Sequence, residues 1–82
     1  MELYQLTTFR TIAALGSFSQ AAEVLGYAQS TVSDQIKNLE TELQTSLFKR
    51  AGSKKVVLTP AGEALLKHAE KMSDIEQEIK VS

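Results

Sequence analysis

The sequence predicts a small, mostly α-helical domain that carries one two-stranded hairpin and ends in a long helix. Three observations support this fold class. Apolar residues recur at helical spacing in several segments, and two short β-leaning runs flank a glycine-containing tip. The chain has 82 residues, of which 43% are hydrophobic, so it can build one thin core and cannot be a multidomain enzyme.

The first helix is predicted over residues 3–15, where apolar side chains recur every three or four residues and Gly16 ends the pattern. A second, short helix is expected to begin within residues 17–19 and to run to Leu25. We expect the side chain of Ser19 to accept hydrogen bonds from the free backbone N–H groups of its first turn.

A third helix is predicted from about Gln29 to Leu43, after a tight turn that begins at Gly26. Because so short a turn separates them, the second and third helices must cross steeply. One stripe of the third helix is apolar, formed by Val32, Ile36, Leu39 and Leu43. Its outer face carries short or flexible hydrogen-bonding side chains, namely Gln29, Ser30, Ser33, Asp34, Lys37 and Thr41.

The last third of the sequence predicts a hairpin and a long helix. The runs 47–50 and 56–58 favour strands around a basic tip, and Thr59-Pro60 is typical of a helix start. The helix from Pro60 has apolar positions spaced alternately by four and three residues, which is the spacing of a coiled coil. The apolar stripe that they form must be covered by another part of the protein or by a partner. These positions are Ala61, Leu65, His68, Met72, Ile75 and Ile79.

The positive charge of the chain is concentrated in one segment. The overall net charge is −1, which by itself argues against a nucleic-acid-binding domain. Residues 43–62, however, contain four cationic side chains and no acidic one, whereas residues 1–42 and 63–82 are both net acidic. The acidic total therefore leaves nucleic-acid binding open.

Several other classes of protein are disfavoured. The sequence has no apolar run of membrane-spanning length and no secretory signal, and its lack of cysteine favours a reducing compartment, with the cytoplasm as the default. An enzyme is not expected, because there is no glycine-rich phosphate loop, no thiol and no carboxylate pair set against a histidine. The lone histidine, His68, has no companions that would make a metal site.

The order of elements is that of a winged helix-turn-helix, in which the second helix of the motif can lie in the major groove of DNA. At particular residues the chain resembles the N-terminal DNA-binding domain of the LysR-type transcriptional regulators. The matches are Leu6, Phe9, Gly16-Ser17-Phe18-Ser19, Ala21-Ala22, Leu25, Gln29, Val32-Ser33, Ile36, Leu39-Glu40, Leu43, Leu47-Phe48, Arg50, Leu58-Thr59 and Ala61-Gly62.

The resemblance implies a winged helix-turn-helix DNA-binding domain over residues 1–59 and a linker and dimerisation helix over residues 60–82. It further implies a homodimer, with a tetramer possible in a longer parent protein, that binds an interrupted inverted repeat in double-stranded DNA. No cofactor is expected in this chain, because the resemblance places a small-molecule effector in a C-terminal domain beyond it. The chain is therefore expected to be part of a longer regulator.

The candidate site residues fall into three groups. On the predicted recognition helix, Gln29, Ser33 and Asp34 are assigned to base edges, and Ser30, Thr31 and Lys37 to phosphates or bases. In the predicted wing, residues 49–57, the cations assigned to the DNA backbone or minor groove are Arg50, Lys54 and Lys55. Dimerisation is assigned to Leu65, His68, Met72, Ile75 and Ile79. The alternative is that the apolar residues of this stripe pack on the chain's own first helix, and the family resemblance implies that both contacts share the long helix.

Four features depart from the family pattern. Ala28 replaces a capping serine, Asp34 replaces an arginine, and Gln44 replaces the glycine that ends the recognition helix. The wing tip is about one residue longer and has lysines in place of arginine. Asp34 and the acidic total support an alternative function, a winged-helix module that binds a protein instead of specific DNA.

Overall fold

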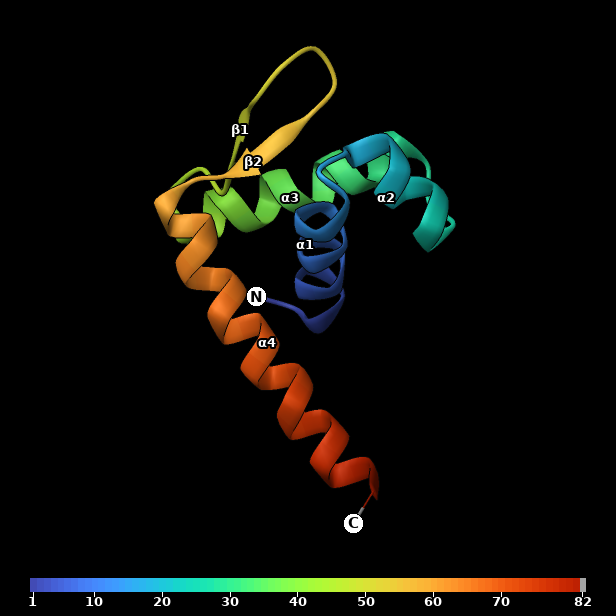
Figure 1. The fold of residues 1–82 in the computed structure, drawn as a ribbon, viewed down its shortest axis with the longest axis vertical. Helices are drawn as coiled ribbons and strands as arrows, with labels where there is room; N and C mark the ends of the chain where they lie inside the picture. Colours follow the sequence, from blue (N-terminus) through green and yellow to red (C-terminus); the bar gives the residue numbers. More distant parts are fainter. Residues whose placement is uncertain (82) are drawn as a thin grey trace.

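Three helices pack across one another before the chain enters a two-stranded sheet and a long helix (Figure 1). The computed structural model describes residues 1–81, without the side chains at positions 73, 76, 80 and 81. The elements are α1 (Leu3–Leu15), α2 (Phe18–Leu25), α3 (Gln29–Leu43), β1 (Phe48–Arg50), β2 (Val56–Leu58) and α4 (Pro60–Val81). This order confirms the predicted winged helix-turn-helix followed by a long helix.

The hydrophobic core lies where α1, α2 and α3 meet, and Leu47 and the first half of α4 close it. Its members are Leu6, Phe9, Ile12, Ala21, Ala22, Val32, Ile36, Leu39, Leu47, Leu65 and Ala69. The Phe48 ring of β1 packs on this core, with its centroid 5.3 Å from that of Phe9 and 5.5 Å from that of Phe18. The base of the hairpin is therefore fixed to the helices.

The first two helices end as predicted, but α2 begins differently. Gly16 and Gly26 both take left-handed φ values, 67° and 75°, which glycine adopts at little cost. The N-terminal cap of α2 is Ser17, whose hydroxyl accepts a 3.1 Å hydrogen bond from the backbone N–H of Gln20. The assignment of Ser19 as the cap was wrong, because the helix starts at Phe18 and Ser19 already lies in its first turn.

Both ends of α3 carry the unusual residues that the sequence indicated. Ala28 occupies the N-cap and has no side chain able to accept a hydrogen bond from the first turn. At the other end Gln44 takes a left-handed φ of 56°, the one positive φ at a non-glycine position in residues 1–81. The apolar stripe is shorter than predicted, because Leu43 is 36% exposed and only Val32, Ile36 and Leu39 are buried.

The hairpin is antiparallel, and Lys49 pairs with Val57 at its centre. The backbone N–H of Ala51 donates to the carbonyl oxygen of Lys55, which closes the exposed tip. The first strand is one residue shorter than predicted, since Leu47 lies outside it and is buried in the core. The second strand is tied to the end of α1, where the N–H of Val56 donates to the carbonyl oxygen of Gly16.

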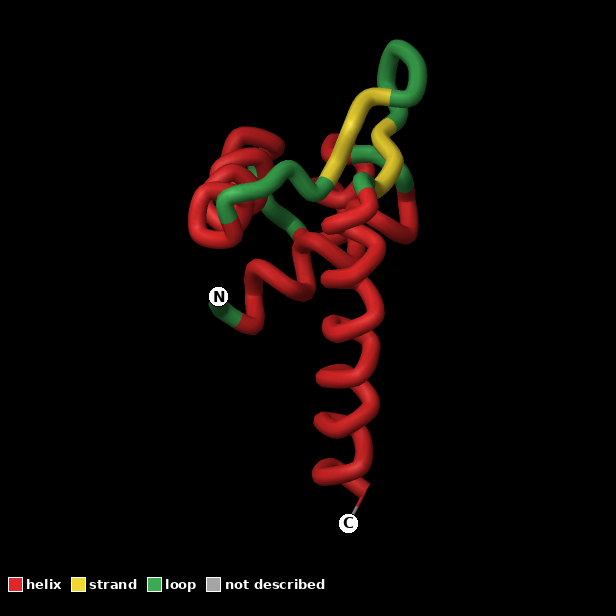
Figure 2. Tube along the Cα trace, turned by 90° about the vertical axis from the view of Figure 1, so that its left-hand side faces the viewer, coloured by secondary structure: helices red, strands yellow, loops and turns green. Residues whose placement is uncertain are grey.

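The long helix α4 leaves the rest of the domain as it proceeds toward the C-terminus (Figures 1 and 2). Thr59 caps it as predicted, since its hydroxyl accepts from the backbone N–H of Gly62. Leu65 is buried because α4 packs on α1 over its first turns, as in the alternative in which this stripe packs on the chain's own first helix. Within the described residues, no helix is long and apolar enough to cross a membrane.

Candidate nucleic-acid interface

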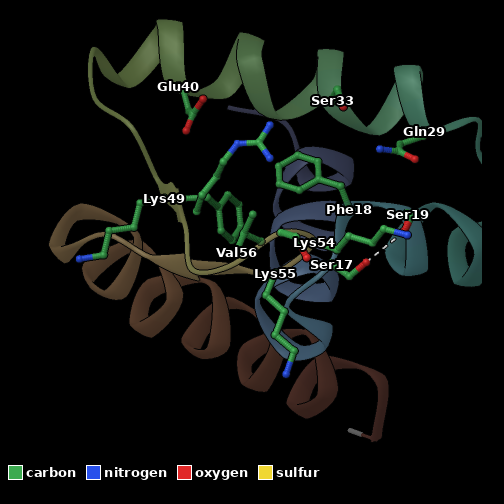
Figure 3. Close-up of a pocket in the computed structure, with 13 residues that line it drawn as sticks. Ser17, Phe18, Ser19, Gln29, Ser33, Glu40, Lys49, Lys54, Lys55 and Val56 are labelled. Atoms are coloured by element: carbon green, nitrogen blue, oxygen red, sulfur yellow. Dashed lines mark hydrogen bonds between the residues drawn. The ribbon is translucent and has the colours of Figure 1, made fainter.

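A groove of about 610 Å³ lies between α3, from Gln29 to Glu40, and the hairpin, and the start of α2 also lines it (Figure 3). It is lined mainly by polar and cationic side chains, together with the rings of Phe18 and Phe48. The lining residues are Ser17, Phe18, Ser19, Gln29, Ser33, Glu40, Phe48, Lys49, Arg50, Ser53, Lys54, Lys55 and Val56. Three segments that are separate in the sequence therefore form one surface.

The predicted recognition residues divide between the groove and the rest of the helix face. Gln29 and Ser33 line the groove. The remaining four lie on exposed α3 outside its lining, and these are Ser30, Thr31, Asp34 and Lys37. One turn separates Gln29 from Ser33, so both can reach the same side of the helix.

The N-terminus of α3 can attract anions. Thr31 and Val32 donate their backbone N–H groups to the carbonyl oxygen of Ala28, but no side chain caps the N–H groups that precede them. Uncapped N–H groups and the positive end of the helix dipole together favour a phosphate. The alanine that the sequence marked as a departure therefore leaves this end of α3 open to an anion.

All three predicted wing cations line the groove, and two polar residues join them. Arg50, Lys54 and Lys55 lie where the sequence placed them, together with Lys49 and Ser53. In Figure 3 the side chains of Lys49 and Lys55 point away from α3. These two cations therefore extend the positive surface beyond the groove itself, along the flanks of the hairpin.

Glu40 is an acidic group within this cationic surface. Its carboxylate oxygen Oε2 accepts a 2.7 Å hydrogen bond from the backbone N–H of Leu47. Among residues that the structure describes, no salt bridge joins Glu40 to a wing cation. The carboxylate therefore binds a backbone N–H group of the connection between α3 and β1.

Sequence reasoning missed eight lining residues for different reasons, and two of them, Phe48 and Val56, are apolar residues of the strands. Lys49 and Ser53 belong to the acid-free segment and could have been found from its charge alone. The only sequence feature that singled out Glu40 was its match to the family pattern. The other three, Ser17, Phe18 and Ser19, were family matches too, and they reach the groove because the start of α2 packs beside the wing, a tertiary relationship.

The described residues give no support for a metal centre. No group of three or more potential ligands among His, Cys, Asp and Glu comes together in them. His68 lies exposed on α4, away from the groove.

Comparison with known proteins identifies the family. The model of a "Bacterial regulatory helix-turn-helix protein, lysR family" matches residues 3–63. The chain belongs to the LysR family. It is thus a helix-turn-helix regulatory domain, in agreement with the prediction that it is not an enzyme.

Individual relatives in the LysR family match almost the entire chain. The uncharacterized HTH-type transcriptional regulator YwqM of Bacillus subtilis is 45% identical over 82 residues, which are 100% of this chain and 28% of that protein. The DNA-binding domain of BenM in complex with benA site 1 DNA superposes with a TM-score of 0.88 at 39% identity, covering 99% of this chain and 94% of that one.

A full-length LysR-family structure extends the comparison. LysG of Corynebacterium glutamicum, solved with the bound effector Arg, gives a TM-score of 0.90 at 34% identity. The match covers 99% of this chain and 27% of LysG. The chain therefore spans about a quarter of the length of these longer relatives.

Proposed function

We propose that this chain is the DNA-reading part of a LysR-family transcription regulator and that it binds double-stranded DNA in a sequence-specific way. Residues 1–59 form the reading unit, and α4 serves as the linker and dimerisation helix predicted for residues 60–82, of which position 82 lies outside the described residues. One observation carries the proposal: a single groove brings the polar start of α3 and the wing cations onto one surface. The relative BenM was solved on DNA through its corresponding domain.

In this proposal α3 enters the major groove with its N-terminal half. Gln29 has the bidentate amide that suits adenine, and Ser33 one turn later reaches a neighbouring base edge. Asp34 is exposed and can accept a hydrogen bond from cytosine N4. Ser30, Thr31 and Lys37 bind phosphates or bases beside them, and the uncapped start of α3 adds backbone donors.

The wing supplies binding that is independent of sequence. Arg50, Lys54 and Lys55 contact the DNA backbone or the minor groove, and Lys49 adds a fourth cation. Each phosphate that they neutralise releases condensed counterions, so affinity falls steeply as salt rises.

The exposed face of α4 is proposed to pair with a second copy of the chain. Met72, Ile75 and Ile79 are 44%, 56% and 70% exposed, and His68 lies on the same stripe. Covering this stripe removes apolar surface from water and relates two reading units by two-fold symmetry. Such a homodimer binds an interrupted inverted repeat, and a tetramer would bind two such sites.

The whole protein is proposed to be a cytoplasmic regulator that senses a small molecule. The relative LysG carries its effector in a chain of which this sequence matches 27%. We therefore assign effector binding to a C-terminal domain in the longer parent protein, and no cofactor to residues 1–81.

Selection from a random pool of duplexes tests the proposal. The purified chain is expected to recover an interrupted inverted repeat, and titration of the recovered duplex should show affinity falling steeply with salt. Recovery of no motif, with only weak and salt-sensitive binding, would contradict sequence-specific reading by this chain. That result would instead support the protein-binding alternative.

A further inference from the structure

The backbone of Leu47 lies between the proposed reading helix and the long helix. Its N–H donates to Glu40 of α3 at 2.7 Å, and its carbonyl oxygen accepts from the N–H of Thr59 at 3.0 Å. The Leu47 side chain is buried in the core at 1% exposure. One residue thus holds the last turns of α3 on one side and the start of α4 on the other.

Thr59 fastens the first turn of α4 to this residue. Its hydroxyl donates to the carbonyl oxygen of Ser46 at 2.6 Å and accepts from the N–H of Gly62 at 3.1 Å. Gly62 packs so closely that a Cβ there would lie 2.2 Å from the carbonyl oxygen of Leu47. The first turn of α4 therefore rests directly on the Leu47 peptide.

These contacts fix the direction of α4 relative to α3. A second anchorage follows where Leu65 and Ala69 enter the core, so α4 is held at two successive places. From Thr59 to Ile75 a helix extends about 24 Å at 1.5 Å per residue. A change of about 10° at Thr59 would displace the far end by about 4 Å, close to the 3.4 Å rise of one base pair.

We propose that Thr59 is a positioning residue that sets the spacing between the two half-sites the dimer accepts. The inference rests on the proposed function, in which two chains pair through α4 and each reads one half-site. The distance between the two α3 helices then depends on the angle at which each α4 leaves its domain. Thr59 contacts the backbone at Ser46, Leu47 and Gly62, and its action on DNA is indirect.

The test uses the half-site that the wild-type chain selects. Duplexes carry two copies in inverted orientation with the spacer varied one base pair at a time over a helical turn, and one duplex carries a single copy. Thr59→Val removes the hydroxyl and keeps the shape. Thr59→Asp keeps an acceptor for the N–H of Gly62 but cannot donate to Ser46, and Thr59→Ser retains both bonds.

The wild type and Thr59→Ser are expected to prefer one spacing over its neighbours by about tenfold, the cost of a poorly fitted contact. In Thr59→Val and Thr59→Asp this ratio should fall to about threefold or less, while affinity for the single half-site stays within about twofold. An unchanged spacing profile in Thr59→Val would overturn the proposal, because this variant lacks both hydroxyl contacts. Loss of the fold in both, followed by circular dichroism, would overturn it too, by assigning the contact to stability alone.

Failure of the proposed function gives a different result. If the wild-type chain shows no preference between spacings, or binds two half-sites no better than one, then pairing through α4 is wrong and the inference falls with it. If the wild type has a sharp preference that Thr59→Val retains, pairing stands and only the role of Thr59 is wrong.

Discussion

The hydroxyl of Thr8 on α1 donates a hydrogen bond to the side-chain oxygen Oε1 of Gln35 on α3. Thr8 is almost fully buried, whereas Gln35 is partly exposed on the side of α3 that faces α1. This polar contact joins the back of the proposed reading helix to the first helix, beside the apolar core.

Thr8→Val is expected to lower the free energy of unfolding by about 1–2 kcal/mol, because it leaves the Gln35 oxygen without its donor while keeping the side-chain shape. Urea denaturation followed by circular dichroism measures the change. Thr8→Ser retains the hydroxyl and should lose less stability. A larger loss in Thr8→Ser than in Thr8→Val would show that packing of the methyl group matters more than the hydrogen bond.

Replacement of Gln44 by glycine is expected to stabilise the chain. Gln44 holds a left-handed φ of 56° at the end of α3 and is exposed, so its side chain adds strain without packing in return. Gln44→Gly should raise the free energy of unfolding by about 0.5–1 kcal/mol. The matched control is Asn38→Gly, on the exposed face of α3, which should lower it by about 0.3 kcal/mol. A loss at position 44 would contradict the strain argument.

The double change Lys54→Ala and Lys55→Ala should weaken binding to every duplex, specific or not. The slope of log affinity against log salt should become shallower by up to about two, since each lost phosphate contact removes about one released counterion. Fluorescence anisotropy at several salt concentrations measures this. Lys67→Ala, which removes a cation from α4, should leave the slope nearly unchanged. Equal changes of the salt slope in the double variant and in Lys67→Ala would contradict DNA binding by the wing.

Ile75→Asp is expected to convert the proposed dimer into monomers, because it puts a charge into the apolar stripe of α4. Sedimentation velocity measures the mass, and affinity for a single half-site should persist. Gln77→Asp adds the same charge at an exposed position off the stripe and should leave the dimer intact. A wild-type chain that sediments as a monomer at all concentrations would contradict pairing through α4.

Helix positions were predictable from the sequence because the relevant signals are local. The bounds of α3 and the left-handed ends at Gly16 and Gly26 follow from apolar spacing and from the conformational freedom of glycine. The cap of α2 was misplaced by two residues, since Ser17 and Ser19 are equally good caps by composition. Only the packed backbone decides which one precedes the first helical residue.

The candidate site was predictable in its charge and less so in its shape. The cations Arg50, Lys54 and Lys55 lie in an acid-free segment that the sequence displays directly. The burial of Leu65 and the contribution of α2 to the groove depend on which helices pack together, and periodicity does not encode that. A heptad stripe shows that a face is apolar, but it does not show which neighbour covers each turn.

The concentration of cations in residues 43–62 also bears on the kinetics of encounter. The segments on either side are net acidic, so the net positive charge of the chain is concentrated at the hairpin and the connections beside it. The electric field of a polyanion such as DNA should orient the chain before contact, so that the hairpin reaches the DNA first. Salt should therefore slow association more than it speeds dissociation, because the short-range contacts of α3 form only after that orientation is complete.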